Sequence, residues 1–224
     1  MAEQRVGEFG IRALVVDWGG VLTGSVDDVW RAWAERDAVD REHLRAVFRD
    51  PGTGAAGSTS LVHALERGEL TGPQFEQRVA EELARQGSPV QPQGLLERML
   101  GGLTPSTSML EVVARVRAAG LRTAVLSNSW ANEYPREGWD ELFDTVVISG
   151  EVGMRKPERA IYELVLDRLA LPAAACVFVD DLAANVAAAV EVGMVGVLHR
   201  SVDQTAAELE VLLGVALLQP GESA

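Results

Sequence analysis

Short apolar runs rich in β-branched residues alternate with amphipathic helical patterns along this 224-residue chain. The runs lie at residues 11–16, 123–126, 145–148, 176–179 and 195–198. Their length and continuous apolar character are typical of strands buried on both faces of a sheet. Helices are predicted between and after the later strands, over residues 109–119, 158–169, 182–192 and 204–213. This alternation constrains the chain to an α/β fold: a parallel sheet between two layers of helices.

Residues 25–103 interrupt the alternation, because they contain helical patterns and no convincing strand. The patterns cover residues 26–37, 41–48, 61–67, 73–85 and 94–100, and a glycine- and serine-rich loop is predicted at 50–60. We therefore predict a core of residues 1–24 and 104–224, with an all-helical cap domain, 25–103, inserted after the first strand. Ligands of open parallel sheets bind beyond the carboxyl ends of the strands, so a cap inserted there would cover the site.

Composition narrows the class of protein. A net charge of −13 disfavours polyanionic partners, so neither nucleic acid nor an anionic membrane surface is expected. The sequence has no apolar run near the roughly 18 residues of a membrane span, and residues 1–10 are too polar for a secretory signal. Cys176 is the one cysteine, which excludes an intrachain disulfide and favours a cytoplasmic location. We expect a monomer or a homodimer.

Polar side chains gather where the predicted strands end. A carboxylate follows the first strand, and two glycines near it let the backbone turn close to a ligand. A Ser-Asn pair follows the second strand, an Arg-Lys-Pro segment lies past the third, and an Asp-Asp pair follows the fourth. The candidate site residues in these segments are Asp17, Trp18, Gly19, Gly20, Ser127, Asn128, Lys156, Asp180 and Asp181.

These residue types suit phosphoryl chemistry. Asp17 and Asp181, facing each other across neighbouring strand ends, would form a hard-oxygen site suited to Mg²⁺. A carboxylate is also a nucleophile toward phosphorus, which gives Asp17 a catalytic role. Ser127 and the backbone of Asn128 would donate to the phosphoryl oxygens. The competing interpretation is that the aspartates, Asp180 included, cap helices and that Ser127 only closes a strand.

Lys156 is the only lysine among 20 basic residues. All the other basic residues are arginine, so the lysine at this position indicates a site that needs a compact ammonium on a flexible stem. It would act there as a point charge on Asp17 and on the phosphoryl oxygens. An ordinary surface lysine that survived by chance is the alternative.

The order of these segments resembles the four motifs of the haloacid dehalogenase superfamily, and the helical insert is placed like that family's subclass I cap. The resemblance covers residues 11–199 and is carried by residues 126–130, 152–158 and 178–185. It is closest to the phosphatase-type branch of the family, which includes the N-terminal domain of soluble epoxide hydrolase. The resemblance implies a Rossmann-like core and an aspartyl intermediate on Asp17. It also implies Mg²⁺ bound by Asp17, Asp181 and the main-chain oxygen of Gly19, with Asp180 behind them in the same metal site.

Gly19 departs from the family pattern. Most phosphatases of this family carry an aspartate there, which protonates the leaving alcohol and then deprotonates the attacking water. Glycine keeps the carbonyl but lacks the acid, a defect worth about 10²–10⁴-fold in rate for poor leaving groups and much less for good ones. Asp27 or Asp28 could replace the acid, although the dipole of the helix predicted to begin at residue 26 accounts for both.

The sequence thus predicts a Mg²⁺-dependent hydrolase of a small phosphorylated substrate. The predicted substrate-binding residues are Trp18, Gly19, Gly20 and Trp130. The first rival is a metal-independent 2-haloacid dehalogenase, in which Arg31 and Arg36 would hold the halide; solvated arginines on a helix face are the simpler interpretation. The second rival is a phosphate-binding or regulatory protein with little turnover.

Overall fold

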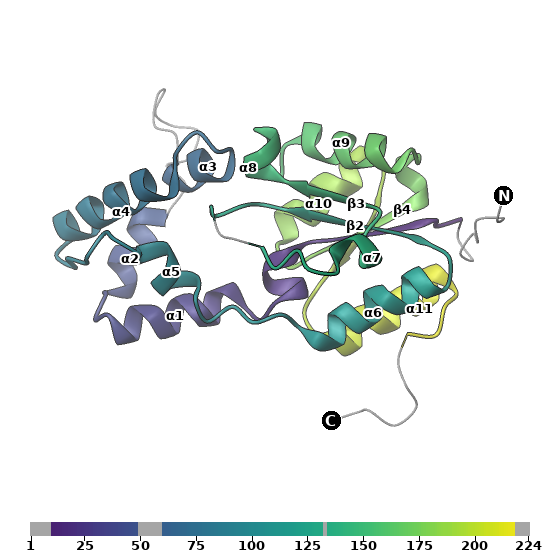
Figure 1. The fold of residues 1–224 in the computed structure, drawn as a ribbon, viewed down its shortest axis with the longest axis horizontal. Helices are drawn as coiled ribbons and strands as arrows, with labels where there is room; N and C mark the ends of the chain where they lie inside the picture. The colour runs from purple at the N-terminus through teal and green to yellow at the C-terminus, as the bar shows by residue number, and fades with distance from the viewer. Residues whose placement is uncertain (1–9, 49–59, 132–133, 218–224) are drawn as a thin grey trace.

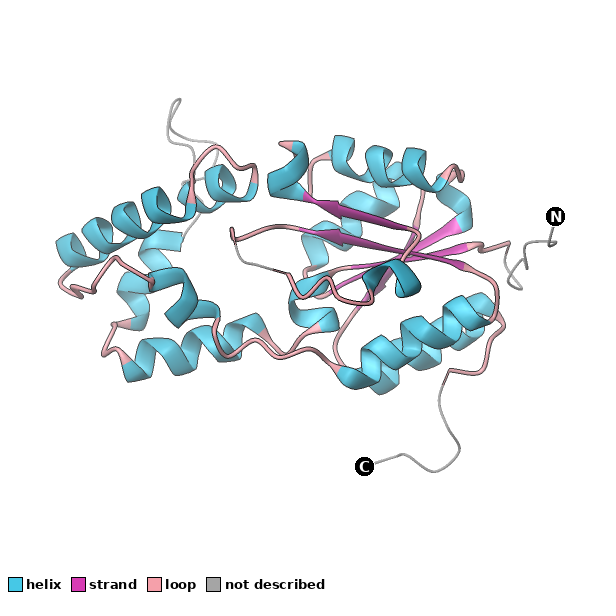
Figure 2. Cartoon of the chain, in the orientation of Figure 1, coloured by secondary structure: helices cyan, strands magenta, loops and turns pink. Residues whose placement is uncertain are grey.

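The computed structural model describes residues 10–48, 60–131 and 134–217. Its centre is a five-stranded sheet in the order β3-β2-β1-β4-β5, in which every pair of neighbours is parallel (Figures 1 and 2). The strands are β1 (Ala13–Val16), β2 (Arg122–Ser127), β3 (Thr145–Ile148), β4 (Cys176–Asp180) and β5 (Val195–Leu198). Each overlaps the run predicted for it, so the α/β prediction is confirmed.

Helices cover both faces of this sheet and make the fold a three-layer, Rossmann-like one. Leu14 and Val16 of β1 pack in the cluster formed with α6 (Thr107–Ala118) and α11 (Val202–Leu213). Ala13 and Val15 point to the opposite cluster, formed with α9 (Arg159–Leu169) and α10 (Ala183–Val192). Successive strand residues face opposite sides, and both sides of β1 are apolar because both are buried. Shorter elements complete the core: η1 (Trp18–Leu22), α7 (Trp139–Leu142), α8 (Ser149–Val152) and η3 (Ala173–Ala175).

Five helices of the predicted cap lie beyond the end of the sheet at which the chain leaves β1 (Figure 1). They are α1 (Val26–Arg36), α2 (Arg41–Phe48), α3 (Leu61–Glu66), α4 (Gly72–Gln86) and α5 (Leu95–Leu100). They enclose an apolar cluster of their own, which includes Trp33, Phe75 and Leu83. No strand occurs in the described part of residues 25–103, and the predicted loop at 50–60 lies almost wholly outside the described residues.

The two connections between these helices and the sheet run side by side. Gly24 N–H donates to the Thr104 carbonyl at 3.1 Å, and an isolated antiparallel bridge joins Thr23 to Pro105. This pairing lies next to both domain boundaries, which stay a prediction. None of the helices in the described ranges combines the length and the apolar character that crossing a membrane requires.

Candidate active site

The polar side chains of three neighbouring strands meet at one edge of the sheet. Ser127 is the last residue of β2 and Asp180 the last of β4. Asp17 follows β1, which lies between them, and its N–H donates to the Val179 carbonyl at 2.9 Å. Parallel strands bring their carboxyl ends to the same edge, which is why residues far apart in sequence converge here.

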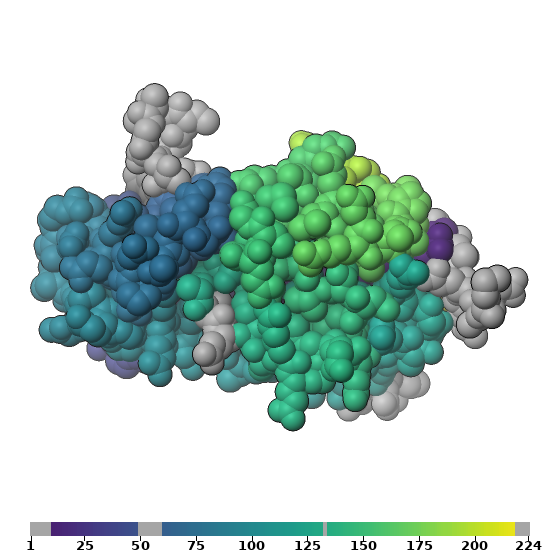
Figure 3. Space-filling model, turned by 45° about the horizontal axis from the view of Figure 1, so that its top comes forward, coloured from purple at the N-terminus to yellow at the C-terminus, as the bar shows by residue number. Residues whose placement is uncertain are grey.

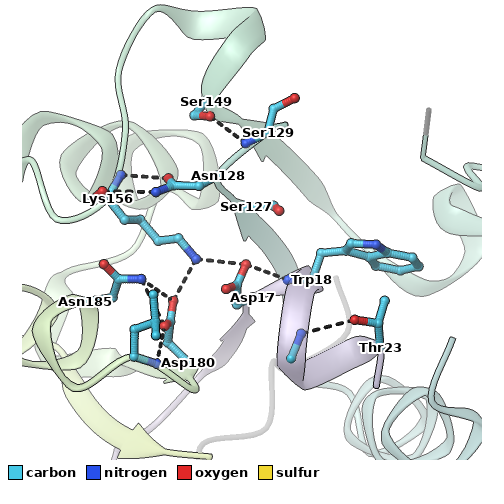
Figure 4. A network of polar contacts seen from close by, with 12 residues as sticks. Asp17, Trp18, Thr23, Ser127, Asn128, Ser129, Ser149, Lys156, Asp180 and Asn185 are labelled. Carbon is cyan, nitrogen blue, oxygen red and sulfur yellow. Dashed lines mark hydrogen bonds and ion pairs between the residues drawn. The ribbon is translucent and has the colours of Figure 1, made fainter. Parts of the chain in front are cut away.

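Lys156 supplies the positive charge of this cluster and is fully buried. Its Nζ lies 2.8 Å from Oδ1 of Asp17 and 2.6 Å from Oδ2 of Asp180. Dashed lines mark both contacts in Figure 4. Burial alone would lower the pKa of the ammonium, but the two carboxylates outweigh burial and raise it above its usual value. Lys156 therefore remains charged, and its site is the core of the molecule, not the surface.

Hydrogen bonds from two asparagines and a backbone amide position Lys156 and Asp180. The Asn128 side chain donates to the Lys156 carbonyl at 3.0 Å and accepts from the Lys156 N–H at 2.8 Å. Asn185 Nδ2 donates to both oxygens of Asp180, and the N–H of Leu182 donates to Oδ1 at 2.9 Å. Both Asp180 oxygens are thus engaged by protein groups, so that Asp180 orients Lys156 from below (Figure 4).

Three carboxylates crowd this edge of the sheet. Oxygens of Asp17, Asp180 and Asp181 lie within 4.8 Å of one another. Burial raises the pKa of Asp17, the charges of Asp180 and Asp181 add to the rise, and Lys156 opposes it. Burial, and next the charge of Asp180, raise the pKa of Asp181 to about 6. One ammonium cannot offset three carboxylates, so the donor set fits a divalent cation with oxygen ligands.

Gly20 allows Asp181 to approach the turn after β1. Its φ is +73°, in the left-handed region, and a Cβ built on it would lie 2.2 Å from Oδ2 of Asp181. Gly19 is different: its φ is −67°, and a Cβ there would meet only Cγ2 of Val26, at 3.4 Å. The backbone therefore requires glycine at position 20 and accepts a side chain at position 19.

A cavity of about 390 Å³ opens between these residues and the cap helices. Of the predicted site residues, Asp17, Trp18, Gly19, Ser127, Asn128, Trp130, Lys156 and Asp181 line it, whereas Gly20 and Asp180 do not. Trp130 packs against Trp30 of α1, with ring centroids 4.8 Å apart. Trp18 is buried, and its ring centroid lies 4.9 Å from that of Trp139, so it contributes more to the core than to the cavity.

Ion pairs join α3 to the loop that carries the lysine. Arg155 Nε contacts Oε2 of Glu66 at 2.5 Å, and both residues line the cavity. Beside them Arg67 pairs with Glu158, and the space-filling view shows the blue cap surface meeting the green core along this seam (Figure 3).

Tyr134, Glu66 and Arg155 were not among the residues predicted for the site. Tyr134 lines the cavity, and its hydroxyl lies 3.1 Å from Ser127 Oγ. Burial is the main reason why the pKa of Tyr134 rises to about 12. The one signal in the sequence was that Arg155 immediately precedes the single lysine.

The family model for haloacid dehalogenase-like hydrolases matches residues 11–193. The chain is 30% identical to pig bifunctional epoxide hydrolase 2 over 93% of its own length, but spans only 40% of that protein. It is 32% identical to a sesquiterpene phosphatase of Aspergillus oryzae, over 91% of this chain and 97% of that one.

A solved structure shares the fold. A haloacid dehalogenase family enzyme of Bacteroides thetaiotaomicron, crystallised with magnesium and inorganic phosphate, superposes with a TM-score of 0.64 at 21% identity. The match covers 85% of this chain and 95% of that one.

Proposed function

This chain belongs to the haloacid dehalogenase-like hydrolases, and on that premise we propose that it is a Mg²⁺-dependent phosphatase with Asp17 as its nucleophile. The observation that carries the proposal is the buried ammonium of Lys156 held between Asp17 and Asp180 at the floor of a cavity. An ion pair buried this deeply is weak evidence for stability alone, which favours a catalytic reason for it.

The reaction proceeds in two displacements. An oxygen of the Asp17 carboxylate attacks phosphorus, and the bond from phosphorus to the leaving oxygen breaks, which forms an aspartyl phosphate. Water then attacks the same phosphorus, and the bond to Asp17 breaks to give inorganic phosphate. Lys156 offsets the charge on Asp17 and on the phosphoryl oxygens, and the Ser127 hydroxyl donates to one of them.

Asp17, Asp181 and the carbonyl of Gly19 would hold the metal ion. When bound, Mg²⁺ neutralises charge on the transferring phosphoryl group. The shortage of positive charge around the carboxylates supports this assignment. Asp180, with both oxygens engaged by Lys156, Asn185 and Leu182, acts as a positioning residue behind the metal.

The substrate is a small phosphorylated metabolite with an apolar group beside its phosphate. The lining of the cavity is largely apolar and includes Trp30, Val62, Leu100, Leu103 and Trp130. The cavity volume of about 390 Å³ suits a small organic molecule. The similarity to a sesquiterpene phosphatase over nearly the full length of both chains supports an apolar substrate of this kind.

The dehalogenase alternative receives less support. Arg31 pairs with Asp28, and Arg36 pairs with Asp37, on the exposed side of α1. Neither arginine is among the described residues that line the cavity, so neither is placed to hold a departing halide.

Phosphate release from p-nitrophenyl phosphate and acetyl phosphate, with and without Mg²⁺, tests the proposal. We expect Mg²⁺-dependent release that Asp17→Asn abolishes and an acyl phosphate that hydroxylamine traps in the wild type. Metal-independent halide release from 2-haloacids would instead establish the dehalogenase. Silence in both assays, with Mg²⁺ and phosphate still raising Tm, would establish the binding protein.

A further inference from the structure

A phosphatase with glycine at position 19 needs another group to give a proton to the leaving alkoxide and to take one from the attacking water. We propose that Asp27, from the first turn of α1, is this general acid and base. The inference rests on the proposed phosphatase function and adds a residue to its mechanism.

Asp27 shares the cavity with the reacting groups. It lines the same cavity as Asp17, Gly19 and Asp181, while remaining exposed at the rim.

The direction in which a side chain at position 19 would extend also points to the start of α1. A Cβ built on Gly19 would lie 3.4 Å from Cγ2 of Val26, the residue before Asp27. A side chain at position 19 would therefore extend toward the start of α1. Asp27 follows Val26 in the first turn of α1 and lines the cavity.

The neighbouring aspartate does not meet these conditions. Asp28 is engaged with Arg31 at 2.8 Å and does not line the cavity. Among the described residues, none forms a hydrogen bond or an ion pair with the Asp27 side chain. A helix-dipole role is equal for two adjacent residues of the first turn, so the dipole does not explain why only one of them faces the cavity.

Two other cavity groups that could carry a proton are already committed. The Glu66 carboxylate is paired with Arg155, and the Tyr134 hydroxyl is hydrogen-bonded to Ser127. An ionisable group with a free carboxylate is the better match for a proton that must leave and return in each turnover.

In the proposed sequence the protonated Asp27 carboxyl gives its proton to the leaving alkoxide as the bond to phosphorus breaks. The resulting carboxylate then accepts a proton from the water that attacks the aspartyl phosphate. Phosphate and the free Asp17 carboxylate are formed, and Asp27 is again protonated for the next cycle.

The test compares Asp27→Asn with the matched control Asp28→Asn, which removes the same charge from the same helix turn. For each variant kcat/KM is measured with n-octyl phosphate, whose alcohol needs a proton to leave, and with p-nitrophenyl phosphate, whose phenol does not. We expect Asp27→Asn to lower kcat/KM for octyl phosphate by about 10²–10⁴-fold while p-nitrophenyl phosphate changes little. Adding Gly19→Asp to Asp27→Asn should restore octyl phosphate hydrolysis, which a merely structural defect would not allow.

Several results would overturn the assignment. One is an equal fall of kcat/KM for both substrates in Asp27→Asn. Another is a selective fall of kcat/KM for octyl phosphate in Asp28→Asn or Tyr134→Phe and not in Asp27→Asn. The third is a wild type that hydrolyses p-nitrophenyl phosphate but not octyl phosphate. Should the asparagine variant be unstable, Asp27→Ser provides the same comparison. If turnover survives Asp17→Asn, or the wild type is silent with both substrates, the phosphatase proposal itself fails and Asp27 loses its role with it.

Discussion

Asn128 holds Lys156 through both backbone groups of the lysine, at 3.0 Å to its carbonyl and 2.8 Å from its N–H. This pair of hydrogen bonds ties the end of β2 to the loop that carries the cation. Because the Lys156 backbone is held in place, its side chain extends from a fixed position to Asp17. The sequence predicts a contact of the Asn128 backbone with the phosphoryl oxygens, whereas this use of the Asn128 side chain is visible only in the structure.

Replacing Asn128 by alanine should therefore impair catalysis without touching the reacting atoms. Both polar groups of the Lys156 backbone lose their partner, and the lysine loop shifts. We expect kcat to fall by up to about 10²-fold, with a smaller change in KM, because a misplaced charge weakens transition-state stabilisation more than substrate binding. Steady-state kinetics with p-nitrophenyl phosphate measures the split. An unchanged kcat would show that the lysine loop is held elsewhere.

Gly20→Ala should disturb the metal site. A methyl group at this position would overlap Oδ2 of Asp181 and would occupy a left-handed conformation, so Asp181 must move. We expect Mg²⁺ affinity to weaken by about 10–100-fold, measured by calorimetry. Gly19→Ala is the matched control, because its added methyl meets only Val26 at an ordinary contact distance. Equal losses in both variants would contradict the steric explanation.

The ion pair between Glu66 and Arg155 should stabilise the contact between cap and core. Their side chains are only 7% and 13% exposed, so Glu66→Gln leaves a largely buried guanidinium without its partner. We expect the free energy of unfolding in urea to fall by about 3 kcal/mol.

The exposed pair of Arg159 and Glu163 is the control for that experiment. These side chains are 64% and 50% exposed, and Glu163→Gln should cost less than about 1 kcal/mol. Removing Glu66 and Arg155 together should cost less than the sum of the single losses. Additive losses would mean that the pair does not act as a unit.

Mg²⁺ binding should depend on pH through Asp181, whose pKa burial and the charge of Asp180 raise to about 6. A protonated carboxyl must lose its proton before it binds a metal ion, so protons compete with Mg²⁺ below that value. The affinity should fall by up to about tenfold for each pH unit below 6 and change little through this group above it. Calorimetric titrations across this range would measure the effect, and a pH-independent affinity would rule out Asp181 as a ligand.

The arrangement of strands and helices could be predicted from the sequence because each element leaves a local pattern. Thr71 and the proline two residues later predicted the start of a helix, and the structure has a capping box there, with Gln74 as the partner of Thr71. The short helices α7 and α8 escaped prediction, because four residues are too few for a periodic pattern.

The site was predictable where it depends on strand ends and not where it depends on the cap. Asp17, Ser127 and Asp180 follow from the rule that parallel strands end at one edge. The contact of Glu66 with Arg155 joins a helix of the predicted cap to a loop of the core, 89 positions apart in the sequence, and no local pattern records such a pairing. Which aspartate of α1 faces the cavity likewise depends on how that helix is rotated, and the sequence leaves both choices open.

The complete burial of Lys156 also determines how the folded protein meets amine-directed reagents. Because the chain has one lysine and its ammonium is enclosed between two carboxylates, acylating labels, lysine cross-linkers and lysine acetylases find no side-chain target on the native surface. Modification of Lys156 therefore requires the active site to open, and the rate at which Lys156 is labelled reports how often that opening occurs.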